Sequence, residues 1–317
     1  MRIVEGSLSI EESVGSVVTI GVFDGVHIGH RKIIERVIET KRLRNLPRSV
    51  LYTFRNHPLT VTHPEMAPPI LTTLPEKLSL LEEFDLDVVL IEDFSTELAG
   101  MNYREFINDI LIQTLRMRHL VVGYDFHLGK NREGSQKKLA REGERMGFGV
   151  TIVPPVVLSG TAVSSTRIRK CIKERHIKRA AKFLGHDYFF DAVVVEGEGV
   201  GRRIDFPTAN LRIDDEAKLL PPDGVYAVKA ELSGEKFAGM MNIGRAPTIR
   251  NDERRTIEVH LLGLSKMIYG ERIRVHFAGF IRGEEKFENA DLLREQLKKD
   301  KEAAIRILQK NGTEDAS

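Results

Sequence analysis

The hydrophobic pattern of the sequence changes near residue 185, and this change limits the possible folds more than any other feature. Before it, apolar runs typical of buried strands alternate with amphipathic stretches of helical period, as in the strand 16–23 and the helix 30–43. Such alternation predicts a parallel sheet covered by helices, with ligands beyond the carboxyl ends of the strands. The other elements expected in this half are strands at 49–54, 87–92, 118–123 and 150–157 and helices at 75–84, 102–115 and 135–147.

After residue 185 the strand-like runs are short and follow one another directly. Glycine, proline and aspartate separate them, which is typical of an antiparallel barrel or sandwich. A helix is expected over 289–310. We therefore predict two domains, an α/β domain over residues 1–185 and a β domain with a C-terminal helix over 186–317. The strands expected in the second domain are 188–197, 225–232, 236–244, 256–263 and 272–280.

Composition excludes several classes of protein. The sequence contains no run of about 18 apolar residues, so no transmembrane helix is expected. The N-terminus lacks the basic start and apolar core of a signal peptide. The single cysteine, Cys171, excludes a disulfide framework, fits a reducing compartment and is expected to have only a packing role. The net charge of +2 gives no argument for a nucleic-acid partner.

The strongest local motif is GVFDGVHIGH at 21–30, which follows an expected strand and opens an expected helix. Backbone N–H groups and the helix dipole attract phosphate at such a position, and Gly25 and Gly29 let the backbone approach a bulky anion. His27 and His30 lie within one helical turn and can donate hydrogen bonds to phosphate oxygens in a charge-spread transition state. A metal site or a pair of surface histidines is disfavoured, because no further ligand cluster accompanies the pair.

The His-x-Gly-His pattern occurs both in nucleotidyltransferases and in class I aminoacyl-tRNA synthetases. The segment LSKM at 264–267 resembles a fragment of the synthetase lysine loop, but it lies between expected barrel strands, in the other domain. The chain also shows no tRNA-binding extension. We therefore favour nucleotidyl transfer over amino-acid activation.

A second motif, VSSTRIR at 163–169, complements the histidine loop. Its Ser-Ser-Thr run suits a helix N-cap with free hydroxyl and N–H donors, and Arg167 and Arg169 can reach phosphates with forked donors. Taken alone, the motif is more typical of an ordinary capped basic helix. Paired with the histidine loop in the same expected domain, it predicts the second half of an ATP site.

The segment from Arg167 to Lys182 is strongly basic, with eight Lys or Arg against one acidic residue, Glu174. Such a segment can indicate nucleic-acid binding. We favour phosphate binding with a solvated helix face instead, because no aromatic stacking residue interleaves until Phe183.

Two neighbouring motifs indicate phosphate chemistry in the second domain. Gly197, Gly199 and Gly201 allow a loop to fold over phosphates, although any flexible turn can have this spacing. In the Pro-Thr-Ala-Asn run that follows, Thr208 offers a hydroxyl and Asn210 an amide oxygen to a hard cation such as Mg²⁺. The structural alternative for this run is a turn capped by its own side chains.

The segment TIEVHL at 256–261 is expected to be a strand that carries a functional carboxylate. Period-two alternation puts its three apolar residues on one face and Glu258 with His260 on the other. Glu258 can then take the proton from a substrate hydroxyl that attacks the γ-phosphate of ATP. A solvent-facing strand carboxylate is the alternative.

Together, these motifs resemble those of the bacterial bifunctional riboflavin kinase/FMN adenylyltransferases, also called FAD synthetases. The first domain is similar to their adenylyltransferase module in the two motifs above, in TFRNHP at 53–58 and in VVGYDFHLGKNREGS at 121–135. The second domain is similar to their riboflavin kinase module in PTAN and TIEVHL, PPDGVYAV at 221–228, NIGRAPTI at 242–249 and YGERIRVHFAGFIRGEEKF at 269–287. The two modules cover almost the whole chain in the order of the family.

The resemblance implies a Rossmann-like nucleotidyltransferase domain, a six-stranded antiparallel barrel and a role for each matching residue. The residues that it implies to be catalytic are His27, His30, Arg167 and Glu258. The ATP site of the adenylyltransferase would include Gly21, Phe23, Asp24, Gly25, Gly29, Ser164, Ser165, Thr166 and Arg169. The flavin side of that cleft would include Phe54, His57, Pro58, Asp125, Phe126, Gly129 and Arg132. The ATP site of the kinase would include Gly197, Gly199, Gly201, Arg202, Pro207, Thr208 and Asn210, with magnesium at Thr208 and Asn210.

The sequence departs from the family at three places in the second domain. Asp205 stands where a glycine usually precedes Phe-Pro-Thr-Ala-Asn, Leu-Gly-Leu at 262–264 replaces Leu-Asp-aromatic, and Ile249 replaces a common aromatic residue. A carboxylate beside the phosphate loop would either repel ATP or join the magnesium shell. The changes do not touch the expected magnesium ligands or the expected base.

The implied function is a cytoplasmic, multifunctional transferase of FMN and FAD biosynthesis. It would phosphorylate riboflavin with ATP and then adenylylate FMN with a second ATP, with Mg²⁺ and with flavins as substrates and products rather than redox cofactors. We expect a monomer or weak homo-oligomer with no nucleic-acid or membrane partner. One alternative is an adenylyltransferase whose kinase is impaired. Another is a flavin sensor or storage protein, which is disfavoured because pure binding needs neither the histidine pair nor Glu258.

Overall fold

The structure is a computed structural model, and it describes residues 1–6, 14–130, 133–197, 206–247 and 253–314. It divides into two compact units, Met1–Ser165 and Thr166–Ser317. Helices α7 (Ser165–Lys173) and α8 (Ile177–Leu184) fall largely in the second unit, where α8 packs against the barrel strand β14. The first barrel strand, β9, begins at Phe189, and the domain boundary expected at residue 185 stays a prediction.

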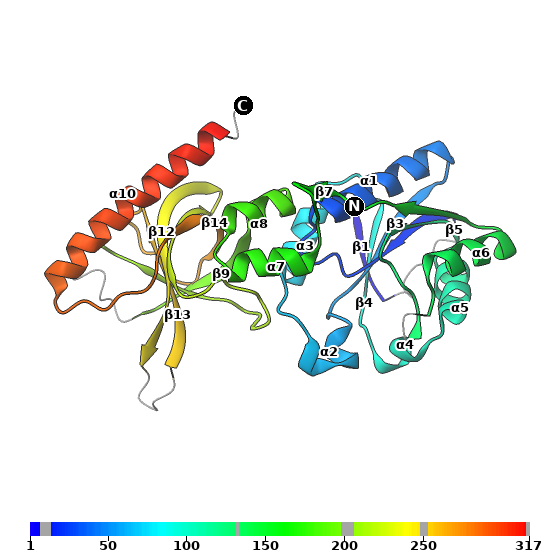
Figure 1. Ribbon diagram of the computed structural model, residues 1–317, viewed down its shortest axis with the longest axis horizontal. Coiled ribbons are helices and arrows are strands. Elements are labelled where there is room, and N and C mark those ends of the chain that lie inside the picture. Colours follow the sequence, from blue (N-terminus) through cyan, green and yellow to red (C-terminus); the bar gives the residue numbers. More distant parts are fainter. Residues whose placement is uncertain (7–13, 131–132, 198–205, 248–252, 315–317) are drawn as a thin grey trace. The chain divides into compact units, whose positions relative to one another are not determined.

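The first unit is built on a parallel sheet of six strands in the order β1-β4-β3-β2-β5-β6 (Figure 1). Every residue of the central strands β2 and β3 is buried, so both faces of the sheet are covered, as is usual for parallel sheets. The strands are β1 (Arg2–Glu5), β2 (Ser16–Ile20), β3 (Arg48–Phe54), β4 (Val88–Glu92), β5 (Met117–Gly123) and β6 (Gly149–Val153).

The helices and strands of the first unit follow the expected alternation, although several bounds differ, and two of the differences have a clear description. The helix expected at 102–115 is a short α5 continued by a π-helix, η3, in which Leu115 N donates to Ile110 O. The strand expected at 150–157 ends at Val153, because the next two residues are prolines and cannot donate to a sheet. The elements are α1 (Ile28–Leu43), α2 (Leu59–Thr62), η2 (Pro64–Met66), α3 (Leu74–Leu81), α4 (Thr96–Gly100), α5 (Tyr103–Glu105), η3 (Phe106–Thr114), α6 (Gln136–Met146), β7 (Val157–Leu158) and β8 (Thr161–Ala162).

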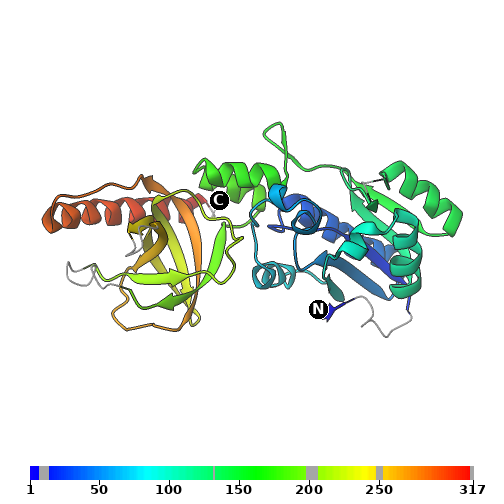
Figure 2. The same cartoon turned by 90° about the horizontal axis from the view of Figure 1, so that it is seen from below.

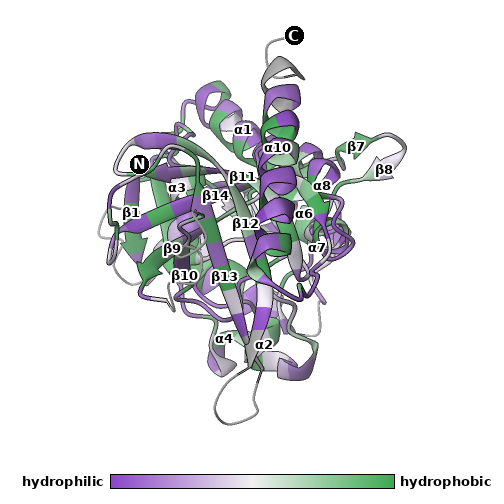
Figure 3. Cartoon of the chain, turned by 90° about the vertical axis from the view of Figure 1, so that its left-hand side faces the viewer, coloured by the Kyte–Doolittle hydropathy of each residue, from purple (hydrophilic) through white to green (hydrophobic). Residues whose placement is uncertain are grey.

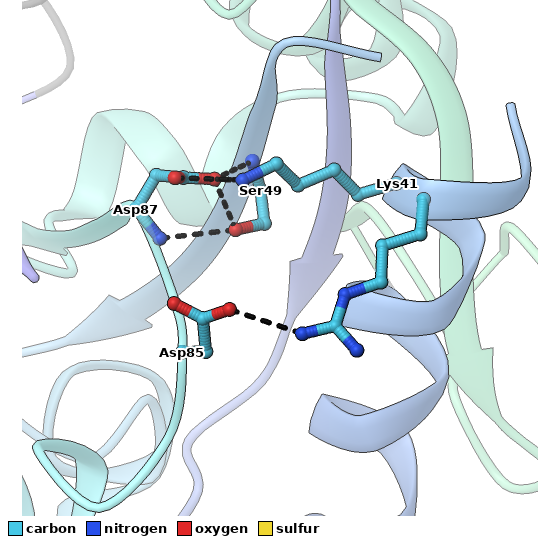
Figure 4. A network of polar contacts seen from close by, with 5 residues as sticks. Lys41, Ser49, Asp85 and Asp87 are labelled. Carbon is cyan, nitrogen blue, oxygen red and sulfur yellow. Dashed lines mark hydrogen bonds and ion pairs between the residues drawn. The ribbon is translucent and has the colours of Figure 1, made fainter. Parts of the chain in front are cut away.

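A polar network fixes the C-terminal end of α1 at the amino edge of the sheet (Figure 4). Lys41 donates to both carboxylate oxygens of Asp87 at 2.8 and 2.6 Å, and the backbone N–H and hydroxyl of Ser49 donate to the same carboxylate at 2.7 and 2.6 Å. Burial acts to raise the pKa of Asp87, but the hydrogen bonds from Lys41 and Ser49 lower it overall. Because α1 begins at the histidine loop and ends here, this network anchors the end of the helix that is remote from His30.

The second unit is a closed antiparallel barrel in the order β10-β13-β12-β11-β14-β9. Its interior is aromatic: the ring of Phe277 lies 5.9, 5.7 and 5.5 Å from those of Tyr188, Phe190 and Tyr226. The predicted fold class, an α/β nucleotidyltransferase-like domain followed by a six-stranded barrel, is confirmed. The strands are β9 (Phe189–Val195), β10 (Ala209–Arg212), β11 (Gly224–Leu232), β12 (Glu235–Pro247), β13 (Glu253–Leu261) and β14 (Arg272–Arg282).

The C-terminal helix α10 (Ala290–Glu314) runs along one side of the barrel (Figures 1 and 2). It packs against β11, β12 and β14, and its apolar positions alternate with polar ones (Figure 3). A small buried cluster joins it to the outer face of the barrel and contains Phe206, Ala227, Met240, Ala278 and Ala304. In the described part of the chain, none of the helices has the length and apolar character needed to cross a membrane.

Candidate active sites

The sheet of the first unit has a topological switch point at β2. From β2 the chain continues to β3 and then β4 on one side, whereas β5 and β6 lie on the other side. In open α/β sheets, ligands bind at the carboxyl ends of the strands where the order reverses. The histidine loop follows β2, and the 121–135 motif begins in the last residues of β5 and continues into the loop after it, so both loops start at this position.

The histidine loop has an unusual backbone. Phe23, Gly25 and Val26 have φ angles of 51°, 80° and 37°, in the left-handed region. This region suits glycine but is unfavourable for a β-branched residue such as valine, and such strain persists only when the surroundings fix it. The loop is therefore held in place by contacts from elsewhere in the unit.

The carboxylate of Asp24 supplies part of this support. It is buried and accepts hydrogen bonds from the backbone N–H groups of Leu71, at 2.8 and 3.0 Å, and Thr72, at 3.0 Å. The N–H of Gly25 donates to Thr72 Oγ1 at 3.0 Å, and Ser165 Oγ donates to the backbone oxygen of Asp24 at 3.0 Å. Asp24 thus stabilises the loop through these hydrogen bonds, and contact of Asp24 with ATP stays a prediction.

The two histidines form a stacked pair at the start of α1. Their ring centroids are 3.6 Å apart with an interplanar angle of 15°. His27 is the N-cap of α1, and its Nδ1 accepts a hydrogen bond from the N–H of His30 at 3.2 Å. A neutral His27 must therefore carry its proton on Nε2. A Cβ atom at Gly29 would lie 3.1 Å from the His27 ring, a tight contact that glycine avoids.

The surroundings of His30 disfavour its charged form. Burial lowers its pKa well below the usual value, and the neighbouring His27 and Lys77 act in the same direction. A neutral imidazole still donates one N–H. The pair can thus offer hydrogen bonds to phosphate oxygens without moving a proton, and the structure brings His27 and His30 together as predicted.

The other predicted residues of the first unit follow β3 and β5. The Phe54 ring is mostly buried against Phe94, with centroids 5.2 Å apart, and His57 Nδ1 accepts from the N–H of Leu59 at 3.2 Å. Pro58 is the N-cap of α2. These contacts give the three residues local structural roles, and contact with flavin stays a prediction for them.

The loop after β5 closes around Tyr103. Asp125 is exposed and Phe126 is half-buried against the core. Gly129 has a φ of 77°, and a Cβ atom there would lie 2.5 Å from the backbone nitrogen of Tyr103, so only glycine fits. Arg132 lies outside the described residues.

Helix α7 carries the predicted Ser-Thr-Arg segment. Ser164 and Ser165 end the first unit, whereas Thr166, Arg167 and Arg169 are counted with the second. Along α7, Thr166 and Arg167 are exposed, whereas Arg169 is buried. Cys171 is buried as a free thiol, and burial raises its pKa, which agrees with the packing role expected for it.

The candidate kinase site is a row of polar side chains across the barrel. Glu258 of β13 pairs directly with Asn210 of β10 on one side and with Asn242 of β12 on the other. Because directly paired residues of a sheet point to the same face, these three side chains share one face. Thr208 Oγ1 donates to Glu258 Oε2 at 3.0 Å. A Cβ atom at Gly197 would lie 1.8 Å from Asn210 Nδ2, so the first loop glycine lies directly against this row.

The predicted alternation along β13 is confirmed. The apolar residues Ile257, Val259 and Leu261 are buried. On the other face His260 is also buried, because Phe206 covers it with ring centroids 5.3 Å apart. Its Nδ1 forms a hydrogen bond of 2.8 Å with the backbone oxygen of Pro207. His260 therefore holds the segment that carries Thr208, a role that sequence reasoning missed.

Sequence reasoning also missed Asn242, although it begins the quoted NIGRAPTI motif. Cross-strand pairing brings it beside Glu258, and this pairing is not visible in one strand alone. Several other predicted features of this site lie outside the described residues, namely Gly199, Gly201, Arg202, Asp205 and Ile249. The residues Leu-Gly-Leu at 262–264, which differ from the family, are among the described residues. Leu264 lines a small, mainly apolar hollow together with Pro207 and Thr208.

The donor set of the second unit fits magnesium. In the described part of the chain, no group of three or more His, Cys, Asp or Glu side chains could hold a metal ion. Magnesium in phosphoryl-transfer sites keeps several waters and binds substrate phosphates and a few protein oxygens, which can include a Ser or Thr hydroxyl and an Asn amide oxygen. Thr208 and Asn210, beside the Glu258 carboxylate, supply such oxygens.

Comparisons with known proteins agree with this division of chemistry. The FAD synthetase family model matches residues 9–167, and the riboflavin kinase family model matches residues 184–308. The bifunctional riboflavin kinase/FMN adenylyltransferase of Escherichia coli K12 is 38% identical over 303 residues, which are 95% of this chain and 96% of that protein. This chain belongs to the bifunctional riboflavin kinase/FMN adenylyltransferase family. The protein of the same name from Bacillus subtilis 168 is 35% identical over 93% of both chains.

A solved structure is similar to this chain over nearly all of its length. A Streptococcus pneumoniae protein, described as a macrolide-efflux protein, has a TM-score of 0.87 at 30% identity and covers 96% of this chain and 99% of its own. The efflux role in its description is a statement about that protein alone.

Membership of this family confirms the function predicted from the motifs. Both halves match, so the findings support two activities in one chain and give no support to an adenylyltransferase with an impaired kinase. The expected enzyme class, an ATP-dependent transferase with riboflavin kinase and FMN adenylyltransferase activities, is that of the family.

Proposed function

We propose that the second unit phosphorylates riboflavin to FMN and that the first unit converts FMN and a second ATP to FAD and pyrophosphate. One observation carries this assignment: each unit has its own site for phosphate chemistry, and the two sites differ in kind. The first presents neutral N–H donors on a strained loop at a switch point. The second presents a carboxylate hydrogen-bonded to a hydroxyl on a barrel face.

In the kinase step, Glu258 is the general base. The terminal hydroxyl of the ribityl chain attacks the γ-phosphorus of ATP, its proton passes to the Glu258 carboxylate, and the bond from phosphorus to the ADP oxygen breaks. The hydroxyl of Thr208 donates to one carboxylate oxygen and so fixes the orientation of the carboxylate. His260 holds this arrangement through the backbone oxygen of Pro207.

Thr208 and Asn210 are the residues that would hold Mg²⁺ in this unit. The ion, when bound with ATP, neutralises charge on the phosphates. Gly197, the first glycine of the predicted loop, lies against Asn210, which supports a phosphate site at this end of the row.

In the adenylyl step, no general base is needed. The phosphate of FMN is already ionised at neutral pH, and its oxygen attacks the α-phosphorus of ATP while the bond to pyrophosphate breaks. His27 and His30 donate hydrogen bonds to the phosphate oxygens on which charge develops. On the flavin side, the exposed Asp125 and the half-buried Phe126 offer a carboxylate and a ring face.

Flavins are substrates and products in this scheme, and none is needed as a redox cofactor. The partners are riboflavin, FMN, FAD and ATP, with neither nucleic acid nor membrane. We place the protein in the cytoplasm as a monomer or weak homo-oligomer, and the buried thiol of Cys171 is suited to a reducing compartment.

A time course with riboflavin, ATP and Mg²⁺, with the flavins separated by chromatography, tests the assignment. FMN should rise first and FAD should follow. FMN without FAD would contradict the function given to the first unit. FAD from supplied FMN, but no product from riboflavin, would contradict the kinase function and point to the changes at 205 and 262–264.

A further inference from the structure

A buried lysine supports the histidine loop, and the motifs do not account for it. Lys77 lies in α3 and is only 5% exposed, although lysine is rarely buried unless it is paired. Its ammonium group donates hydrogen bonds to Val22 O at 3.2 Å, Thr53 Oγ1 at 3.1 Å and Phe54 O at 2.9 Å. All three hydrogens of the ammonium group therefore have an acceptor.

These acceptors belong to two segments that meet at the carboxyl edge of the sheet. Val22 is in the histidine loop, directly before the left-handed Phe23, whereas Thr53 and Phe54 end β3. The hydroxyl of Thr53 also donates to Val22 O, at 3.1 Å. Lys77 thus ties the first residues of the strained loop to the end of the neighbouring strand.

The position of Lys77 is itself fixed by the sequence around it. Thr73 caps α3, and the Thr73 hydroxyl and the Glu76 carboxylate form a reciprocal capping box. The two residues before this cap, Leu71 and Thr72, donate their N–H groups to Asp24. One continuous segment, 71–77, therefore holds the histidine loop at two points.

A comparison with Lys41 shows what is unusual about Lys77. Lys41 lies at the opposite edge of the sheet, where it is paired with the Asp87 carboxylate and its side chain is 23% exposed. Lys77 bonds three uncharged oxygens, and a cation buried in this way is costly. Burial lowers the pKa of Lys77 to about 8, although Asp24 acts in the opposite direction. Its charge also contributes to keeping His30 neutral.

We propose that Lys77 is a positioning residue for adenylyl transfer. Its ammonium group holds the histidine loop in the shape that presents His27 and His30 to the α-phosphate of ATP, without touching the substrate. This role rests on the proposed adenylyltransferase function of the first unit.

The test is a kinetic comparison of the full-length Lys77→Met variant with the wild type. For FAD formation from FMN, kcat should fall about 10- to 100-fold, because a displaced loop misplaces groups that act in the transition state. KM for FMN and for ATP should change less than about threefold, since ground-state contacts remain. The rate of riboflavin phosphorylation in the same chain is the internal control and should be unchanged. A fall in kcat of less than about threefold would overturn the proposal.

Lys41→Met is the matched control, because it removes a lysine from the same sheet at the edge where no ligand is expected. It should keep the wild-type kcat. An equal loss of kcat in both variants would show that general stability, rather than the loop, sets the rate, and would overturn the proposal. In NMR titrations, the His30 imidazole should titrate at higher pH in Lys77→Met and at the wild-type pH in Lys41→Met. An unmoved His30 titration in Lys77→Met would also contradict the role.

A milder change keeps the proposal testable if Lys77→Met does not fold. Thr53→Val removes one of the three acceptors and the second bond to Val22 O. It should lower kcat for FAD formation about 3- to 10-fold, and a folded Thr53→Val protein with wild-type kcat would overturn the proposal. Absence of FAD formation by the wild type would instead refute the proposed function, and the role of Lys77 with it.

Discussion

The two proposed phosphate sites of this chain differ in how their side chains are held in place. In the first unit the proposed catalytic histidines lie on a loop whose backbone is strained. Hydrogen bonds from buried groups of the segment 71–77 hold this loop in place. In the second unit it is carried by side chains at regular positions of neighbouring strands, where the register alone sets Asn210, Glu258 and Asn242 side by side.

This difference determines what a substitution should do at each site. A site built on strand register should lose activity when a reacting side chain is changed. Changes in residues that do not touch the substrate should have little effect on its rate, because the hydrogen bonds between strands fix the barrel backbone. A site built on a strained loop should also respond to changes in residues that never touch the substrate. The predictions below test this contrast, beginning with the largest expected effect.

Removing the proposed base should give the largest effect. Glu258→Gln keeps the shape of the side chain and the hydrogen bond from Thr208 but cannot accept a proton. We expect FMN formation from riboflavin to fall about 10²- to 10⁴-fold, with FAD formation from supplied FMN unchanged. The matched control is Glu235→Gln, at an exposed glutamate of the neighbouring strand β12, which should leave both rates unchanged. Retention of FMN formation by Glu258→Gln would assign the base elsewhere.

Removing one histidine should come next. His30→Ala deletes one of the two stacked N–H donors, and we expect FAD formation from FMN to fall about 10²- to 10³-fold, as for the loss of one donor to a developing anion. Riboflavin phosphorylation should continue at the wild-type rate. His63→Ala, at an exposed histidine of the same unit, is the control and should behave as wild type in both assays. Equal losses in the two variants would remove the pair from the mechanism.

The contrast between the sites also explains how far the sequence could predict them. Period-two alternation is a local property, so the face of Glu258 could be read from six residues of sequence. The histidine motif can be recognised because its glycines and histidines are close in the chain. The residues that support it cannot, since Lys77 and Leu71 are far in sequence from Val22 and Asp24 and only the fold brings them together.

Other differences between expectation and structure have separate causes. Pro154 and Pro155 end β6 earlier than the apolar run suggested, because proline has no N–H for a sheet ladder. Helix η3 takes π-helical rather than α-helical hydrogen bonds, which a hydrophobic pattern alone cannot distinguish. Asn242 needed the pairing of β12 with β13 before its place beside Glu258 was visible.

The buried charge of Lys77 should make the stability of the first unit depend on pH. Its pKa in the folded chain is about 8, below its ordinary value of 10.5, so between these values the unfolded chain binds more protons. Stability therefore rises as the pH is raised through this window, by at most ~3 kcal/mol in total. Calorimetric unfolding should show this rise in the wild type and not in Lys77→Met. An identical pH dependence in both proteins would mean that the ammonium group is solvated.

The smallest effect is expected at the opposite edge of the sheet. Asp87→Asn weakens the network with Lys41 and Ser49, and because this carboxylate is partly exposed we expect a loss of only about 1 kcal/mol in the free energy of unfolding at pH 7. Both enzymatic rates at 25 °C should be unchanged, since the network holds the end of α1 that is remote from the histidines.

The pH dependence of this effect has the same sign as that of Lys77, because both groups have a lowered pKa in the folded chain, but it falls in the acidic range. Because the folded chain lowers the pKa of Asp87, the unfolded chain binds the proton more readily, and the stabilisation is present above the ordinary aspartate pKa of ~4. It is lost as the pH falls through the lower folded value. The difference in unfolding temperature between wild type and Asp87→Asn should therefore shrink as the pH falls from ~5 toward 3. If Asp87→Asn instead lowered the rate of FAD formation, the amino edge of the sheet would control the histidine loop as well, and the distinction between Lys41 and Lys77 would fail.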